Sequence, residues 1–150
     1  MKQGVYNWIH SGGNFQVSFR PLGVFFCSMF PAQGASYSIE DGILVINFQK
    51  YGEYVFSIIP GAHELSGSLK GNTEKWRKIQ LIREFSASEM SIFGEGYGTA
   101  WTFEYAKGSF EVEFRSDAYN HFVCDQYPTH SHWSIDNDVV HISFGQYGKE

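Results

Sequence analysis

Histidines gather in the second half of this 150-residue chain, where their spacing would suit a metal ion. His130 and His132 stand two positions apart, so an extended backbone would place both imidazoles on one face. Imidazole nitrogens are common zinc ligands, and His121, His141 and the thiol of Cys124 lie near in sequence. The pattern predicts a candidate metal site at His130 and His132, with polar surface histidines as the alternative.

Two arginines and two tryptophans recur at similar places in the two halves of the chain. Arg20 and Arg115 each end a strongly alternating segment, and Trp8 and Trp101 each open a half. A pseudo-twofold relation between the halves would bring both arginines to one opening, where they could bind an anion such as a fatty-acid carboxylate. These four residues are predicted to bind ligand; solvent-exposed strand-end charges are the alternative for the arginines.

The two cysteines also occupy equivalent places, each two residues after a Phe and four before a Pro. A nucleophilic or redox role would need an activating base, and only Cys124 has histidines nearby in sequence. Buried, structural thiols are therefore the favoured interpretation of Cys27 and Cys124. Two cysteines also supply no disulfide framework for the fold.

The usual catalytic motifs are missing from the sequence. There is no Gly-x-x-x-x-Gly-Lys phosphate loop, no Gly-x-Ser-x-Gly nucleophile elbow and no His-Glu-x-x-His metal motif. The paired carboxylates Glu111 and Glu113 show no reason for a raised pKa. We therefore predict no catalytic residue and no cofactor, and the question of an enzyme stays open, with a non-enzymatic protein favoured.

Basic residues cluster around Trp76, which is a pattern that can bind single-stranded nucleic acid. Glu74 and Glu84 dilute this cluster, and the net charge of −5 opposes general binding to nucleic acid or to an anionic membrane. We expect a solvated strand face here, and neither a nucleic acid nor a membrane as partner. The basic members of the cluster are Lys70, Lys75, Arg77, Lys78 and Arg83.

These residues must be positioned by β-strands, because apolar side chains alternate through most of the chain. The segment 37–56 reads as three short strands, with a turn at Glu40-Asp41-Gly42 and a second break at Tyr51-Gly52. Segment 75–85 fits both a strand and a helix, and its neighbours favour a strand. Ser86 followed by Glu89 matches a capping box, which predicts a short helix over 87–93.

The chain repeats much of its pattern about ninety-five positions later, which indicates an internal duplication. The first unit covers about 8–100 and the partial second unit about 101–150, where the counterpart of the strand 54–58 is reached at the last residue. Either a longer natural chain or another mode of closure would complete the second unit. The matched positions include Phe15, Val17, Phe19 and Arg20 with Phe110, Val112, Phe114 and Arg115, and Ile46 and Phe48 with Ile142 and Phe144.

Short, aromatic-rich strands with few helices predict an all-β fold, most simply one antiparallel meandering barrel domain of about 8–12 strands over residues 1–150. Trp8, near the beginning of the chain and followed by meandering strands, resembles the calycin group of barrels, which includes lipocalins and fatty-acid-binding proteins. That resemblance covers the succession of short strands along the chain, and it implies a cavity for a small apolar ligand.

Three functions are consistent with this pattern. The surplus of aromatic residues favours a barrel that binds a small apolar or amphipathic molecule. The strand with Ile43 and Val45 opposite Leu44 and Ile46 is apolar on both faces, which would suit a protein partner or a homodimer. An isomerase or cyclase using the cavity is the third. The first residues lack the apolar core of a signal peptide, so the cytoplasm is the expected location.

Overall fold

The computed structural model describes residues 1–94, 98–116, 120–136 and 138–145. These residues form thirteen strands, one α-helix and two short 3-10 turns, η1 (Pro21–Gly23) and η2 (Gln49–Tyr51). The first eight strands are β1 (Gly4–His10), β2 (Gly13–Arg20), β3 (Val24–Phe26), β4 (Ser36–Glu40), β5 (Ile43–Asn47), β6 (Glu53–Ser57), β7 (Glu64–Leu69) and β8 (Asn72–Glu84). The others are α1 (Ala87–Phe93), β9 (Gly98–Tyr105), β10 (Gly108–Arg115), β11 (Phe122–Val123), β12 (His132–Asp136) and β13 (Val139–Ser143).

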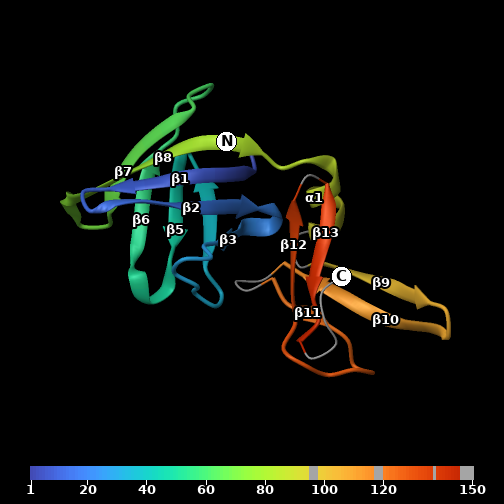
Figure 1. Ribbon diagram of the computed structural model, residues 1–150. Helices are drawn as coiled ribbons and strands as arrows, with labels where there is room; N and C mark the ends of the chain where they lie inside the picture. The colour runs from blue at the N-terminus through green and yellow to red at the C-terminus, as the bar shows by residue number, and fades with distance from the viewer. Residues whose placement is uncertain (95–97, 117–119, 137, 146–150) are drawn as a thin grey trace.

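Strands β1–β8 form a closed barrel in which each strand pairs with its neighbours in sequence (Figure 1). Strand β8 closes the barrel by pairing antiparallel with β1, where Trp8 lies opposite Ile79. Every barrel strand therefore has a partner on both edges, which removes the exposed edges of an open sheet. The predicted all-β fold with an antiparallel barrel and one short helix is confirmed.

The barrel interior is filled by the apolar faces of the alternating strands. Phe19, Leu44, Ile46, Phe56 and Ile79 are fully buried, because period-two alternation directs them all inward. Trp8 lies among them, with its ring 5.7 Å from Phe48 and 5.0 Å from Tyr54 in edge-to-face contacts. Small barrels are commonly filled by side chains in this way.

The predicted turn at Asp41 and Gly42 and the packing at Gly67 both have visible physical causes. Asp41 and Gly42 form the β4–β5 turn with φ of 52° and 75°, as a two-residue hairpin of this type requires. Gly67 lies opposite Phe56 between β6 and β7, and a Cβ there would come within 2.6 Å of the Phe56 ring. The absent side chain thus allows the ring to pack against the backbone.

The two ambiguous segments are resolved by their neighbours. Segment 75–85 is strand for most of its length, because β8 pairs with β7 on one edge and with β1 on the other. The helix α1 begins at Ala87 behind a complete capping box, in which the Ser86 hydroxyl accepts from the Glu89 backbone N–H at 3.1 Å. Both predictions are confirmed.

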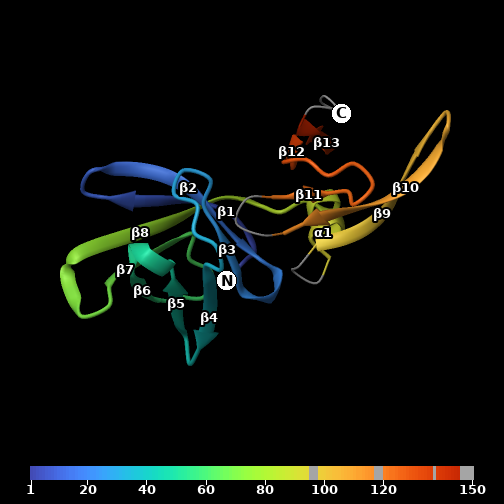
Figure 2. The ribbon, with the colours of Figure 1, turned by 90° about the horizontal axis from the view of Figure 1, so that it is seen from below.

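The remaining strands form a second body with its own core, beside the barrel (Figures 1 and 2). Strands β9, β10 and β11 make one sheet and β12 and β13 a two-stranded sheet, and a bridge from His121 to His132 joins them. The closed barrel consists of β1–β8 alone. Whether all 150 residues act as one domain stays a prediction. The second core contains Ile92, Phe93, Val112, Phe114, Phe122, Cys124, Trp133, Ile142 and Phe144.

The strand pairs of this second body match those of the barrel position by position. Gly13 lies opposite His10 in β1–β2, and Gly108 lies opposite Tyr105 in β9–β10. Phe19 pairs with Phe25, as Phe114 pairs with Phe122. The pairs Val24–Ser36 and Tyr37–Ile46 correspond to His121–His132 and Trp133–Ile142. Strands β9–β13 thus follow the order and register of β1–β5.

Candidate functional site

An aromatic hollow of about 170 Å³ opens at one end of the barrel. We call it the barrel mouth. The turns β1–β2, β3–β4, β5–β6 and β7–β8 all lie at this end, because alternate turns of a meander emerge on the same side. Its lining consists of six aromatic side chains, one histidine and one arginine: Trp8, His10, Phe15, Phe30, Phe48, Tyr51, Tyr54 and Arg77.

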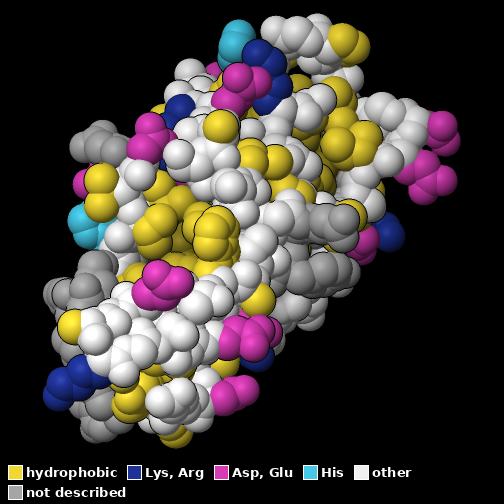
Figure 3. All heavy atoms as spheres, turned by 90° about the vertical axis from the view of Figure 1, so that its right-hand side faces the viewer, with side chains coloured by type: hydrophobic (Ala, Val, Ile, Leu, Met, Phe, Trp, Pro, Cys, Tyr) yellow, Lys and Arg dark blue, Asp and Glu magenta, His cyan; other side chains and the backbone are white. Residues whose placement is uncertain are grey.

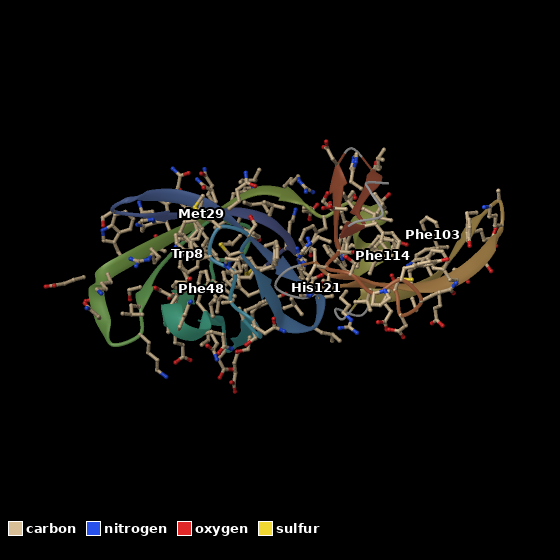
Figure 4. The ribbon with its side chains drawn as sticks, turned by 60° about the horizontal axis from the view of Figure 1, so that its bottom comes forward. Trp8, Met29, Phe48, Phe103, Phe114 and His121 are labelled. Atoms are coloured by element: carbon tan, nitrogen blue, oxygen red, sulfur yellow. The ribbon has the colours of Figure 1, made fainter. Side chains whose placement is uncertain are left out.

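The floor of the barrel mouth is the exposed end of the barrel core. Trp8 and Phe15 lie opposite one another on β1 and β2, with their rings stacked at 6.0 Å. Figure 4 labels Trp8 and Phe48 within this part of the molecule. At the rim, Phe30 and Tyr51 touch edge-to-face at 5.5 Å and are each about one-third exposed, at 36 %. The rim therefore presents apolar ring faces to solvent.

Arg77 gives the barrel mouth its positive charge. It lies on the inner face of β8, opposite Gly67, and its guanidinium lies 5.3 Å from the centre of the Tyr54 ring. Its Nη1 donates to the Trp76 carbonyl oxygen at 2.8 Å. No described carboxylate lies within ion-pair distance of Arg77, and the lining of the barrel mouth contains no acidic residue.

The lining of the barrel mouth offers apolar ring faces and one cation. Its histidine, His10, has Nδ1 occupied by the Gly12 backbone N–H at 3.1 Å. The nearest thiol, Cys27, is buried, and burial raises the pKa of this thiol and so keeps it protonated. Apolar rings beside an unopposed cation can hold a flat apolar group and a negative charge together.

Of the four predicted ligand-binding residues, only Trp8 lines the barrel mouth. Trp101 lies on β9 and is 47 % exposed. In the strand register, the residue that corresponds to Trp8 is Phe103, two positions after Trp101. The position of each tryptophan at the beginning of a half predicts that Trp8 and Trp101 correspond. The strand pairing shows instead that Trp101 corresponds to Tyr6. Trp101 lies opposite Val112 on β10, and Tyr6 lies opposite Val17 on β2.

The two predicted arginines lie in different surroundings. Arg20 is buried between the barrel and the second body, with its guanidinium over the rings of Phe26 and Phe93 at 4.0 and 4.8 Å. It also donates to Ser18 Oγ at 3.1 Å and to Asn120 Oδ1 at 2.6 Å. Arg20 therefore joins the two bodies.

Arg115, the counterpart of Arg20, is exposed and pairs with Glu113 at 3.1 Å. Glu113 corresponds to Ser18, so both arginines contact the residue two positions before them. The position is thus structural in both units, and only the surroundings differ.

His132 of the predicted metal-site pair lies beside a third histidine, His121, and a metal site at His130 and His132 stays a prediction. The rings of His121 and His132 lie 5.3 Å apart across the bridge between their segments, and Figure 4 labels His121 near the junction with the barrel. His130 and His132 are both exposed on either side of the buried Ser131. Among the described residues, no group of three or more side chains is arranged to hold a metal ion.

The basic cluster around Trp76 is divided by ion pairs. Lys70 pairs with Glu53 and Lys78 with Glu64, both at exposed positions. Arg83 makes a two-pronged contact with Glu89 at 2.6 and 3.0 Å. Of this cluster, Arg77 is the member that faces the barrel mouth.

Sequence reasoning missed most of the barrel mouth, although a usable signal was present. Phe15, Phe30, Tyr51 and Tyr54 each stand in or beside a turn, and these turns are every second one along the chain. Aromatic residues beside alternate turns of a meander are a sign of a common end. Alternation with Ile79 and Leu81 places Arg77 on the inner face of β8, but only closure of the barrel brings it beside Tyr54 at the mouth.

Comparison of the chain with protein-family models, with curated proteins and with solved structures found no match. None of the helices among the described residues has the length and apolar character needed to cross a membrane.

Proposed function

We propose that this chain is a non-enzymatic binding protein whose barrel mouth takes a small amphipathic molecule with a flat apolar group and a negative charge. The observation that carries the proposal is the aromatic hollow beside Arg77, a guanidinium without a carboxylate partner among the described residues. A charged group left without a partner at the edge of an apolar site favours a ligand of opposite charge.

The size of the barrel mouth limits the ligand. A hollow of about 170 Å³ resembles the cavity of about 150 Å³ that accepts benzene in an engineered protein core. Because the interior is occupied by Phe56 and its neighbours, the ligand would sit at the end of the barrel, above Trp8. One or two fused rings would fit there, with the charged group directed at Arg77.

A relationship to the calycin group is part of this proposal. A closed barrel of eight antiparallel strands in meander order is the architecture that lipocalins use. The filled interior differs from a barrel that encloses its ligand, so the proposed site is at the mouth. We also propose the cytoplasm as the location, since both cysteines are free and buried.

A matched pair of dyes tests this function. The anionic dye 8-anilinonaphthalene-1-sulfonate and the uncharged dye N-phenyl-1-naphthylamine share a naphthyl ring system and differ in charge. Arg77→Gln should weaken binding of the anionic dye about tenfold, or ~1.4 kcal/mol, and leave the uncharged dye unchanged. Tyr51→Ala should weaken both dyes, because it removes part of the apolar rim.

The control is Arg115→Gln, which removes an exposed arginine outside the barrel mouth. Amide chemical-shift changes on dye binding should fall on the turns of the mouth and spare β9–β13. Equal affinity of Arg77→Gln and Arg115→Gln for the anionic dye would contradict the proposal.

A second candidate function is a protein-interaction surface on the outside of the barrel. Val45, Val55, Ser68 and Trp76 stand in one row across β5, β6, β7 and β8, and Trp76 is 41 % exposed. Ile43 on β5 adds a further exposed apolar side chain. Size-exclusion chromatography with light scattering would reveal self-association of the wild type. If this surface supports it, Trp76→Ser should weaken the self-association.

A further inference from the structure

The second body has the form of the first five strands of a barrel. Strands β9–β13 pair in the order and register of β1–β5, and the bridge at His132 links β12 to the segment before β11. In the barrel, strands β6–β8 connect β5 back to β1. Among the described residues of the second body, no strands connect β13 back to β9.

The two outer edges of the second body are therefore open. In the barrel, β5 pairs with β6 and β1 pairs with β8. Within the described part of the chain, β13 pairs only with β12, and β9 only with β10. Each open edge presents backbone N–H and C=O groups that can accept another strand.

The apolar face between these edges is incompletely covered. Tyr6 is 4 % exposed in the barrel, whereas its counterpart Trp101 is 47 % exposed on the same inner face. Leu44 is fully buried, and its counterpart Val140 is only partly buried. The view from the side of β9 and β10 shows hydrophobic side chains exposed in several patches (Figure 3).

The barrel shows what covers this face in the first unit. Trp8 touches Tyr54 at 5.0 Å and Phe56 at 5.7 Å, and both come from β6. Figure 4 labels Phe103, the counterpart of Trp8, in the second body, where no strand corresponding to β6 is described. Helix α1 covers part of this face with Ile92 and Phe93, and the part around Phe103 and Val140 is left without a counterpart of β6–β8.

We propose that the open edges of β9 and β13, with the apolar face between them, form a strand-accepting site for a polypeptide of the β6–β8 type. The occupant is a segment of three antiparallel strands with aromatic and aliphatic side chains at every second position. Its first strand would pair with β13 and its last with β9. The second body would then close as an eight-stranded barrel.

A second copy of this chain is a poor source for such a segment. Its own β6, β7 and β8 already have partners on both edges in the closed barrel. Its second body has five strands, whereas three strands, β6–β8, complete β1–β5 in the barrel. The occupant is therefore a separate β-forming segment, distinct from the strands described here.

A synthetic peptide with residues 53–84 of this sequence serves as the probe, because it carries β6–β8. Added to the full chain, it should form a one-to-one complex and slow amide hydrogen exchange in β9 and β13 at least tenfold. Exchange in β1 and β5 should not change, since these strands already have partners on both sides. Fluorescence of the protein should shift to shorter wavelength as Trp101 becomes buried.

Two controls keep the test decisive. A peptide with Tyr54→Ser and Phe56→Ser leaves the protein untouched and should bind at least tenfold more weakly. Val140→Asp on the inner face should abolish binding, whereas Val139→Asp, at an exposed outward position, should not. Failure of the unaltered peptide to slow exchange in β9 and β13 would overturn the proposal, as would a peptide-free dimer that protects these two edges.

Discussion

Glu89 is a single side chain that holds two elements together. Its carboxylate accepts from Arg83 at the end of β8 at 2.6 and 3.0 Å, and from the Ser86 backbone N–H before α1 at 2.9 Å. Burial alone would raise the pKa of Glu89, but the contacts with Arg83 and Ser86 outweigh it and hold the pKa below its ordinary value of 4.5. The ionised form therefore stabilises the fold.

A pH dependence of stability follows from this lowered pKa. The contribution of Glu89 is fully present above its unfolded pKa and is lost as the pH falls through the lower, folded pKa. Glu89→Gln should reduce the free energy of unfolding by about 1 kcal/mol at pH 7, a value kept small because the Arg83 side chain is half exposed.

Urea unfolding of both proteins at pH 7 and near pH 3 measures this effect. The difference between the wild type and Glu89→Gln should shrink in acid, because the wild-type carboxyl is then partly protonated. A difference that stays constant over this range would show that the charge of Glu89 does not stabilise the junction of β8 and α1.

At the scale of elements, each unit secures the end of its second strand with the same kind of hydrogen bond. The Tyr37 hydroxyl donates to the Arg20 carbonyl oxygen at 2.6 Å, and Trp133 Nε1 donates to the Arg115 carbonyl oxygen at 2.8 Å. Tyr37 and Trp133 are counterparts in register. The residue type has changed between the units, but the donor and the acceptor position are kept.

Tyr37→Phe tests this hydroxyl, which also bonds with the Gln3 side chain, because it removes one oxygen and leaves the ring. The free energy of unfolding should fall by about 1 kcal/mol, the typical net contribution of one hydrogen bond. Tyr51→Phe is the matched control, since the Tyr51 hydroxyl makes no hydrogen bond with a described residue; it should change stability by less than about 0.5 kcal/mol. Thermal unfolding followed by circular dichroism compares the two, and equal effects would contradict this role of Tyr37.

At the scale of the whole molecule, the two bodies have separate hydrophobic cores. Phe19 belongs to the barrel core and Phe114 to the second core, and both are buried. The contacts across the junction involve few residues, with Arg20 reaching Asn120 and Phe93. Little apolar area therefore couples one core to the other.

We expect Phe19→Ala and Phe114→Ala each to cost about 3–5 kcal/mol within its own body. Native-state hydrogen exchange should show faster exchange in β1–β8 for Phe19→Ala, and in β10–β13 for Phe114→Ala. Each variant should leave the other body within about 0.5 kcal/mol of the wild type. Acceleration of both bodies by either variant would mean that they unfold as one unit.

Local patterns in the sequence determined much of this architecture. Alternation of Phe15, Val17 and Phe19 defines a strand face, and the pair Ser86 and Glu89 defines a helix start, because both depend on neighbours a few residues away. The matching register of β1–β5 and β9–β13 was predictable for the same reason: strands with the same pattern direct the same residues inward.

Tertiary structure decided everything that depends on which strands become neighbours. Closure of the barrel placed Arg77 beside Tyr54 at the mouth, and the bridge between distant segments brought His121 beside His132. Contacts between distant segments made Arg20 a buried junction residue and left its counterpart Arg115 exposed. Alternation along a strand fixes which side chains share a face, but only closure of the barrel fixes what that face meets.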